Sequence, residues 1–231
     1  MKQLLLSLAE AIAALKSGRF VMVHDDKARE NEVDMVIAAE QVRPHHIGTM
    51  RKDAGGLICL AIANHITSKL GLVYMHDILA NMGRVNPIFL KLTEGRTTYG
   101  DKPSFSIAIN HRSTHTGITD QDRAVTIYKM AEICKKIDNG GVEQFARSFR
   151  APGHVPILIA SKHLLHDRMG HTELCVYLMQ LADLTPAVAI CEMMDLATHK
   201  ALSIDAAQEY AAKSGIPLID ASELKANAKV A

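Results

Sequence analysis

The chain has 231 residues, of which 48% are hydrophobic and 22% are charged, and its formal net charge at pH 7 is +1. This length fits one large domain, and the composition is typical of a globular core and excludes a disordered chain. The near-zero net charge gives no support for nucleic acid or an anionic membrane surface as a partner.

The first twenty residues predict a helix followed by a strand. Apolar residues recur at helical spacing from Leu5 to Leu15, and Gly18 stands where a C-terminal cap is expected. Because Glu10 interrupts the apolar stretch, the segment is not typical of a signal peptide. No run in the sequence is long and apolar enough to cross a membrane. The cysteine usage described below predicts a cytoplasmic protein.

The other elements are predicted from apolar periodicity and from the breakers between them. We expect strands at 19–24, 33–40, 57–62, 104–110, 155–160, 187–193 and 216–220, and helices at 44–53, 120–136, 142–149, 172–182, 204–213 and 221–229. The glycine-containing stretch 65–101 receives no regular element. This irregular alternation predicts a single α/β or α+β domain with a mixed β-sheet packed with helices.

The four cysteines, Cys59, Cys134, Cys175 and Cys191, each lie in or beside an apolar run, and no two of them are spaced as CxxC. This pattern predicts reduced and mostly buried thiols. It argues against a disulfide framework and against a structural zinc site, which draws on clustered Cys and His.

An acidic segment between two predicted strands is the first candidate for chemistry. It reads DDKARENEVD from Asp25 to Asp34, and in an extended chain Glu30, Glu32 and Asp34 project from one side. Neighbouring carboxylates repel one another, and a hard divalent cation such as Mg²⁺ or Mn²⁺ relieves that repulsion. The alternative interpretation is a solvated charged turn, because most charged runs lie on the surface.

A second candidate, RMGHTE at 168–173, directly precedes an apolar helix. The start of a helix offers backbone N–H groups and a positive dipole end, Gly170 allows a close approach, and Arg168 can bind a phosphate through two hydrogen bonds. The segment therefore predicts a phosphate site. In the alternative interpretation Thr172 is an ordinary N-cap and His171 is a surface residue.

Two single residues at strand ends are weaker candidates. His154 lies in a Gly-flanked turn that enters a strand, and Glu192 ends a buried strand, where ligands of α/β sheets often bind. A bystander histidine and a glutamate that turns outward are the alternatives. In TGITDQDRA at 116–124, Thr119 is explained as a helix cap and the acids as partners of its dipole. Cys59 is most simply a core residue.

Taken together, the motifs follow the order and spacing of one family, which the chain resembles from about Leu15 to Met194. They are DDKARENEVDM, RKDAGGLIC, FSIAIN, TGITDQDRA, PGHVPIL, RMGHTE and CEMM, and the family is 3,4-dihydroxy-2-butanone 4-phosphate synthase. Each motif alone is weakly diagnostic, whereas the ordered set is specific.

The resemblance implies a lyase of riboflavin biosynthesis that converts D-ribulose 5-phosphate to L-3,4-dihydroxybutan-2-one 4-phosphate and formate. The implied mechanism is metal-assisted enolisation followed by a skeletal rearrangement, with Mg²⁺ or Mn²⁺ as cofactor and one ion, or two, in each active site. It also implies a homodimer with its active sites at or near the subunit interface, and neither nucleic acid nor a membrane as a partner.

The resemblance also implies roles for individual residues. The metal ligands are Glu30 and His171. Substrate binding falls to Arg29, Glu30, Asp34, Thr116, Arg168, Gly170, His171 and Thr172. Catalysis falls to His154 and Glu192, with Glu32, Asp34, Asp25 and Cys59 at further positions in or near the active site.

The chain departs from the family pattern in two places, at 159–163 after PGHVPIL and at 195–200 after CEMM. Both departures flank expected catalytic residues and leave the expected ligands in place. The cysteine-rich motif of a fused GTP cyclohydrolase II is not found, so we expect one synthase domain over residues 1–231. The runner-up hypothesis is a related metal-dependent sugar-phosphate lyase or isomerase with a substrate of different handedness. A non-enzymatic phosphate- or metal-binding module is the third.

Overall fold

The computed structural model describes residues 2–95, 97 and 100–228, with side chains from residue 8 onwards. Its centre is a mixed sheet with the strand order β4-β5-β3-β6-β2-β1-β9. The strands are β1 (Val21–His24), β2 (Val33–Ala38), β3 (Cys59–Ile62), β4 (Phe105–His111), β5 (Phe149–Ile159), β6 (Ala187–Glu192) and β9 (Leu218–Asp220). The pairs β3/β5 and β1/β9 are parallel, and the other neighbours are antiparallel.

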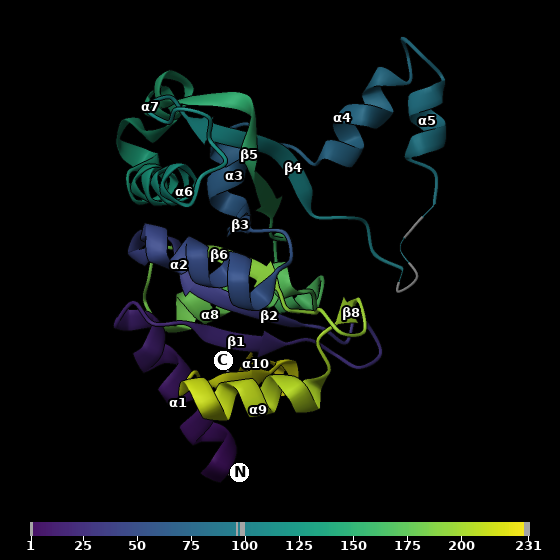
Figure 1. The fold of residues 1–231 in the computed structure, drawn as a ribbon. Helices are drawn as coiled ribbons and strands as arrows, with labels where there is room; N and C mark the ends of the chain where they lie inside the picture. The colour runs from purple at the N-terminus through teal and green to yellow at the C-terminus, as the bar shows by residue number, and fades with distance from the viewer. Residues whose placement is uncertain (1, 96, 98–99, 229–231) are drawn as a thin grey trace.

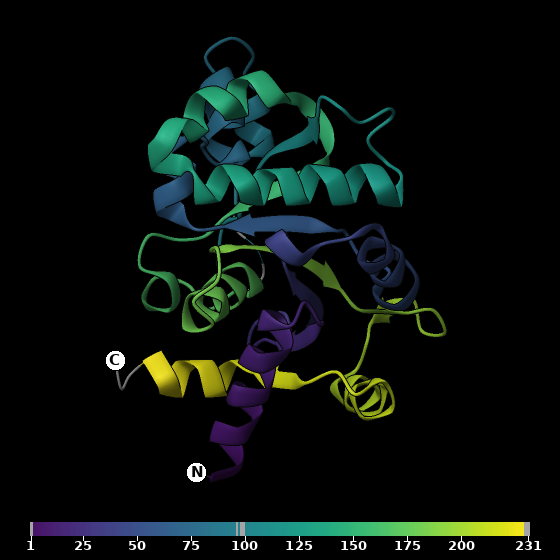
Figure 2. The same ribbon diagram turned by 90° about the vertical axis from the view of Figure 1, so that its left-hand side faces the viewer.

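Helices cover both faces of this sheet (Figures 1 and 2). The helices α2 (Pro44–Thr49) and α6 (Asp120–Lys135) pack together on one face, and α8 (His171–Leu181) lies on the other, where α1 (Lys2–Lys16) and α10 (Ala221–Ala228) contact it. The remaining helices are α3 (Asn64–Lys69), α4 (Met75–Met82), α5 (Ile88–Leu92), α7 (Val142–Ser148) and α9 (Ile204–Ser214). A short hairpin joins β7 (Met194–Asp195) to β8 (Lys200–Ala201).

The core lies on both sides of the central strands. Every residue of β1, β2 and β3 is buried, as expected of strands covered by helices on both faces, which read as continuous apolar runs. Methionines such as Met22, Met35 and Met130 fill volume that aromatic residues occupy elsewhere. All four cysteines are free and buried, which confirms that prediction. No described helix meets the length and hydropathy that a membrane crossing needs.

The predicted mixed α/β fold is confirmed, and the predicted elements lie close to the observed ones. Ser203 caps α9, because its hydroxyl accepts the N–H of Ala206. The strand expected at 155–160 is longer, because β5 begins at Phe149 and pairs with β4 across a register shift. The last predicted helix residue, 229, lies outside the described residues.

The stretch 65–101, for which no element was predicted, contains most of α3 and all of α4 and α5. Neither α4 nor α5 has a buried residue, and Figure 1 shows both projecting from the body of the molecule. Both helices are short, and Gly83 and Pro87 interrupt the sequence between them, so neither fills the window of about 11 to 18 residues on which helix recognition by periodicity depends.

Candidate active site

The acidic segment after β1 folds around the carboxylate of Asp25. This side chain is fully buried, and its oxygens accept the backbone N–H groups of Glu30 at 3.1 Å and of Glu32 at 3.0 Å. The guanidinium of Arg29 donates to the same carboxylate at 3.2 Å. These hydrogen bonds to Asp25 fix the conformation of the loop. The Asp25 side chain does not line the candidate active-site cavity.

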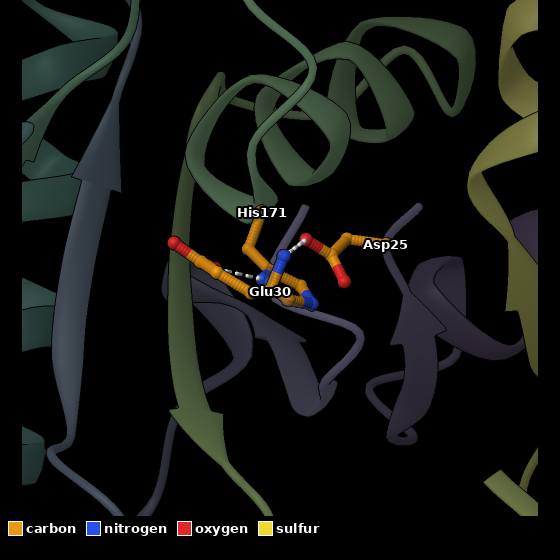
Figure 3. Close-up of side chains that lie close together, drawn as sticks. All are labelled: Asp25, Glu30 and His171. Atoms are coloured by element: carbon orange, nitrogen blue, oxygen red, sulfur yellow. Dashed lines mark hydrogen bonds and ion pairs between the residues drawn. The ribbon is translucent and has the colours of Figure 1, made fainter. Parts of the chain in front are cut away.

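The loop meets the first residue of α8 (Figure 3). Nδ1 of His171 lies 3.2 Å from Oε2 of Glu30, and Nε2 lies 3.2 Å from the backbone oxygen of Glu32. Donor atoms of Asp25, Glu30 and His171 all lie within 4.8 Å of one another, close enough to share one cation. Because Asp25 is engaged by backbone N–H groups, Glu30 and His171 are the better ligands for an ion there, and their oxygen and imidazole donors suit Mg²⁺ or Mn²⁺.

Asp34 and Glu192 are direct neighbours on β2 and β6. Asp34 is buried, and its Oδ1 has no hydrogen-bond partner in the described part of the chain, although it lies 3.8 Å from Nε2 of His171. A buried carboxylate oxygen in this condition is unfavourable unless a cation, a proton or a ligand hydroxyl meets it. It therefore points to an ion or ligand bound beside it.

Several carboxylates in this small volume have altered acidity. Burial and the charges of Glu192, Glu30 and Glu32 raise the pKa of Asp34 to about 7, although His171 opposes the rise. Burial, and next the charge of Glu30, raise the pKa of Glu32. The shift of Asp34 places its carboxyl group in the range in which it exchanges protons near neutral pH.

The pKa of the His171 imidazole is also raised, which for a histidine favours the charged form. Burial alone would lower its pKa, but the charge of Asp34, the hydrogen bond with Glu30 and the charge of Asp25 together raise it to about 9. The surrounding field is therefore strongly negative, which is the field that attracts a divalent cation.

Glu192 is held at the end of β6 by the turn that precedes β3. Its Oε2 accepts the backbone N–H of Leu57 at 2.7 Å. A Cβ at Gly56 would lie 2.5 Å from that same oxygen, so only glycine allows the turn to approach this closely. The glutamate predicted from its strand-end position thus turns into the site and not outward.

Two arginines from distant parts of the chain share one acceptor. Oδ2 of Asp101 accepts from Nε of Arg29 and from Nε of Arg168, each at 3.2 Å. Nη1 of Arg168 also donates to Ser104 at 2.6 Å and to Glu173 at 2.8 Å. Two guanidinium groups that converge on one oxygen form a ready binding point for an anion.

The segment in which a phosphate site was predicted forms the start of α8. Gly170 is the N-cap, so the alternative in which Thr172 caps the helix is wrong, and Thr172 is buried in the first turn, where N–H groups lack intrahelical partners. A Cβ at Gly170 would lie 2.8 Å from guanidinium nitrogens of both Arg29 and Arg168. Glycine at this position therefore lets both arginines reach the helix start.

One cavity of about 220 Å³ joins the acidic loop to this helix start. The two stretches are 134 or more residues apart in the sequence, counted from Asp34 to Arg168, and they meet because β2, β6 and α8 are packed together. The cavity is lined by Arg29, Glu30, Glu32, Asp34, Pro103, Ser104, Phe105, Leu158, Arg168, His171, Thr172, Ile190 and Glu192.

Two predicted site residues form a separate group on β5 and on the loop before α6. His154 and Thr116 are both exposed and neither lines the cavity. Asn110 joins them: its side-chain amide nitrogen donates to the Thr116 backbone oxygen at 3.4 Å and lies 3.1 Å from Nδ1 of His154. Its Oδ1 accepts the backbone N–H of His154 at 2.8 Å. The structure thus brings these two residues together, but outside the cavity of their own chain.

Cys59 is buried at the start of β3 and does not line the cavity. Burial, and then the charges of Glu192 and Asp34, raise the pKa of its thiol far above the ordinary value. A neutral thiol is a poor nucleophile and a poor base. Its position beside β6 suits a packing role, as its apolar surroundings in the sequence suggested.

Sequence reasoning missed Asp101, Ser104, Glu173 and Asn110. The only available signal was for Glu173, an acid in the first turn of a helix directly beside a candidate phosphate-binding arginine. Asp101 lies in the stretch that received no element, and Asn110 is an inconspicuous polar residue of a strand. Their contacts are tertiary, and no local pattern encodes them.

Comparison with known proteins shows the family of the chain. The 3,4-dihydroxy-2-butanone 4-phosphate synthase family matches residues 9–227. The protein of that name from Methanothermobacter thermautotrophicus is 42% identical over 222 residues, which cover 96% of each chain. The one from Archaeoglobus fulgidus is 43% identical over 218 residues, covering 94% of this chain and 92% of the relative.

Solved structures agree with the sequence match. A 3,4-dihydroxy-2-butanone 4-phosphate synthase in complex with two magnesium ions superposes with a TM-score of 0.77 at 28% identity, covering 96% of both chains. The structure of that name from Candida albicans gives a TM-score of 0.74 at 28% identity, covering 95% of this chain and 96% of the other. The chain therefore belongs to the 3,4-dihydroxy-2-butanone 4-phosphate synthase family.

Proposed function

We propose that this chain is a lyase that converts D-ribulose 5-phosphate to L-3,4-dihydroxybutan-2-one 4-phosphate and formate, the step that supplies the four-carbon precursor of riboflavin. Family membership supports the reaction. The observation that carries it to this chain is the single cavity of about 220 Å³ that has a cation-binding end at Glu30 and His171 and an anion-binding end at Arg168 and Thr172.

The anion-binding end suits the substrate's phosphate. Arg168 and Thr172 line it together with Arg29, and the N–H groups of the first turn of α8 face the same region. Glu173 and Ser104 fix the guanidinium of Arg168 from behind, so the arginine is oriented before the substrate arrives. Binding the phosphate at a fixed point places the sugar carbons over the carboxylates.

The opposite end suits Mg²⁺ or Mn²⁺, held by Glu30 and His171, with Asp34 near enough to assist a second ion or a substrate hydroxyl. An ion held by these residues would supply Lewis-acid chemistry that acidifies the proton at C3, beside the substrate ketone. The relative whose structure holds two magnesium ions supports this assignment.

The reaction needs several proton transfers around one small substrate, and the cavity holds the groups for them. Asp34, with a pKa of about 7, can hold or release a proton at its unpartnered Oδ1. Glu32 and Glu192 line the same cavity, and the Leu57 N–H fixes the direction of Glu192. These three carboxylates are the proposed acid and base groups.

His154 and Thr116 are assigned to the site through a second copy of the chain. Both are exposed, both are bound by Asn110, and neither lines the cavity of its own chain. A homodimer in which this group faces the partner's cavity accounts for all three facts. The four free cysteines fit the reducing conditions of the cytoplasm, which is the proposed location.

The test is formate release from purified protein incubated with D-ribulose 5-phosphate and Mg²⁺. We expect turnover that is abolished by EDTA and restored by Mg²⁺ or Mn²⁺. D-Xylulose 5-phosphate, which differs in handedness at C3, is the matched substrate control and should release little formate. Equal turnover of the two, or metal-independent turnover, would overturn the proposal.

A further inference from the structure

A second cavity lies away from the residues discussed so far. Its volume is about 620 Å³, within the range of small-molecule sites and well above the 220 Å³ of the candidate active site. It lies where the chain leaves the parallel strands β3 and β5, and the middle of α8 forms another of its walls. The carboxyl ends of adjacent parallel strands are a common place for ligands in α/β sheets.

The rim of this cavity is basic. His65 follows β3, while Lys162, His163 and His166 belong to the loop that follows β5, and all four side chains are exposed. None of the four side chains is in an ion pair in the described part of the chain, and no acidic residue lines the cavity there, although the Asp167 carboxylate beside it accepts the backbone N–H of His163 at 2.8 Å. One ammonium and three imidazoles on one rim are a donor set that can recognise an anion.

The floor of the cavity is apolar and partly aromatic. Tyr177 of α8 is half-buried there, with its hydroxyl turned to Asn227 at 3.1 Å, and Leu164 and Leu165 lie beside it. A ring face between aliphatic side chains packs against a flat apolar body. The rim and the floor together select a ligand that is anionic at one end and apolar at the other.

We propose that this cavity is a second ligand site that takes an organic phosphate or carboxylate with a flat apolar body, and that its occupancy acts on Arg168. The link is short. The backbone N–H of Ser161, at the start of the basic loop, donates to Oε1 of Glu173 at 3.0 Å, and Oε2 of Glu173 accepts from Arg168 at 2.8 Å. A ligand that draws the loop outward therefore pulls on the carboxylate that orients Arg168.

Binding is tested first without turnover, by titrating the full-length protein into flavin mononucleotide and following the flavin fluorescence. This probe joins a flat ring system to one phosphomonoester, and riboflavin is the matched ligand that lacks the phosphate. We expect flavin mononucleotide to bind roughly tenfold or more tightly than riboflavin, because the phosphate makes charge-assisted hydrogen bonds to the rim. Absence of binding, or equal binding of the two flavins, overturns the proposal.

Variants locate the bound probe. The double variant Lys162→Gln/His166→Gln should bind flavin mononucleotide roughly tenfold more weakly, whereas Lys213→Gln on exposed α9 should not change it. Thr172→Val, at the candidate active site and outside the Ser161–Glu173–Arg168 link, should leave it unchanged as well. Binding that survives the double variant, or that Thr172→Val abolishes, places the flavin elsewhere and overturns the proposal. Both rim residues are exposed, and thermal unfolding checks that the variants remain folded.

The action on Arg168 is tested by kinetics, and this arm alone rests on the proposed function. Flavin mononucleotide should raise KM for ribulose 5-phosphate with kcat unchanged, and the effect should disappear in the Lys162→Gln/His166→Gln variant. An equal rise in KM in both proteins means competition at the active site and overturns the linkage. Failure of the proposed function appears as no turnover, while the fluorescence titration still reports the second site.

Discussion

The Glu30 carboxylate lies 3.2 Å from Nδ1 of His171, although 141 residues separate the two along the chain. Asp25 fixes the loop that carries Glu30, and the packing of α8 on the sheet fixes His171. Neither residue adjusts freely to the other, so the pair is preorganised and the cation site exists before an ion arrives.

Replacing Glu30 by Gln removes the charged ligand and keeps the shape of the side chain. We expect Mn²⁺ affinity, measured by titration calorimetry, and formate release each to fall by about a hundredfold or more, because an ion-binding carboxylate is lost. Glu209→Gln on exposed α9 is the matched control and should behave as wild type. Wild-type Mn²⁺ affinity in the Glu30→Gln protein would show that the ion is held by other residues.

Asp101 occupies the point between Arg29 and Arg168 at which a phosphate oxygen would bind. Asp101→Asn removes this competing charge, so inorganic phosphate should become a stronger competitive inhibitor by roughly threefold to tenfold. Inhibition constants for phosphate in wild type, in Asp101→Asn and in the surface control Asp205→Asn give the comparison. Weaker phosphate inhibition in Asp101→Asn would instead mean that Asp101 serves to hold the two arginines in place.

The proposed dimer predicts complementation between two inactive proteins. His154→Ala and Glu30→Gln should each be nearly inactive alone. If each site combines Glu30 of one chain with His154 of the other, random mixing after dissociation restores about a quarter of wild-type activity, because half of the dimers are mixed and each has one intact site. Formate release from the mixed and reassociated proteins is the measurement. Zero recovery in demonstrably mixed dimers would place both residues in the same site of one chain.

Stability should depend on pH through His46. Burial, and then the charges of His45 and Arg43, lower its pKa from 6.5 to about 4, and its Nδ1 accepts the backbone N–H of Arg43 at 3.0 Å. Between pH 6.5 and 4 the unfolded chain therefore binds a proton at this histidine that the folded chain does not. The contribution of His46 to the free energy of unfolding is complete above pH 6.5 and is lost progressively as the pH falls toward 4.

The variant His46→Asn retains an acceptor near Arg43 and removes the titrating group. Urea unfolding at pH 7 and at pH 5 should show a smaller loss of stability on acidification in His46→Asn than in wild type. His199→Asn, at an exposed turn position, is the control and should lose stability on acidification as wild type does. An equal acid-induced loss in His46→Asn and wild type would mean that His46 is protonated in the folded protein.

Local sequence patterns predicted most of the elements and the two ends of the cavity. The buried strand β3 is an unbroken apolar run, and the segment from Arg168 to Thr172 leads into an apolar helix, so both signals lie within a few residues. The contact between Glu30 and His171 depends on strand order, which no local pattern carries. The family resemblance predicted that the two residues meet, and the structure confirms the contact.

The contacts that sequence could not supply are those between distant polar residues. Asp101 between two arginines, Asn110 between Thr116 and His154, and the Ser161–Glu173 link each depend on the docking of separate elements. The helices α4 and α5 were missed for a different reason, because each is too short for apolar periodicity to identify it. Hydrogen bonds between polar side chains of distant elements follow no fixed spacing in the sequence, so local patterns cannot predict them.

His171 and Thr172, the residues expected to bind the cation and the phosphate, are consecutive at the start of α8. Their Cα atoms are about 3.8 Å apart by covalent geometry. On the proposed assignment one holds the cation and the next holds the phosphoryl group, so the span between those two groups is fixed by the helix itself. On that assignment the start of α8 sets how far apart the cation and the phosphate of the substrate lie. We therefore expect sugar phosphates with one carbon fewer or more to be poorer substrates.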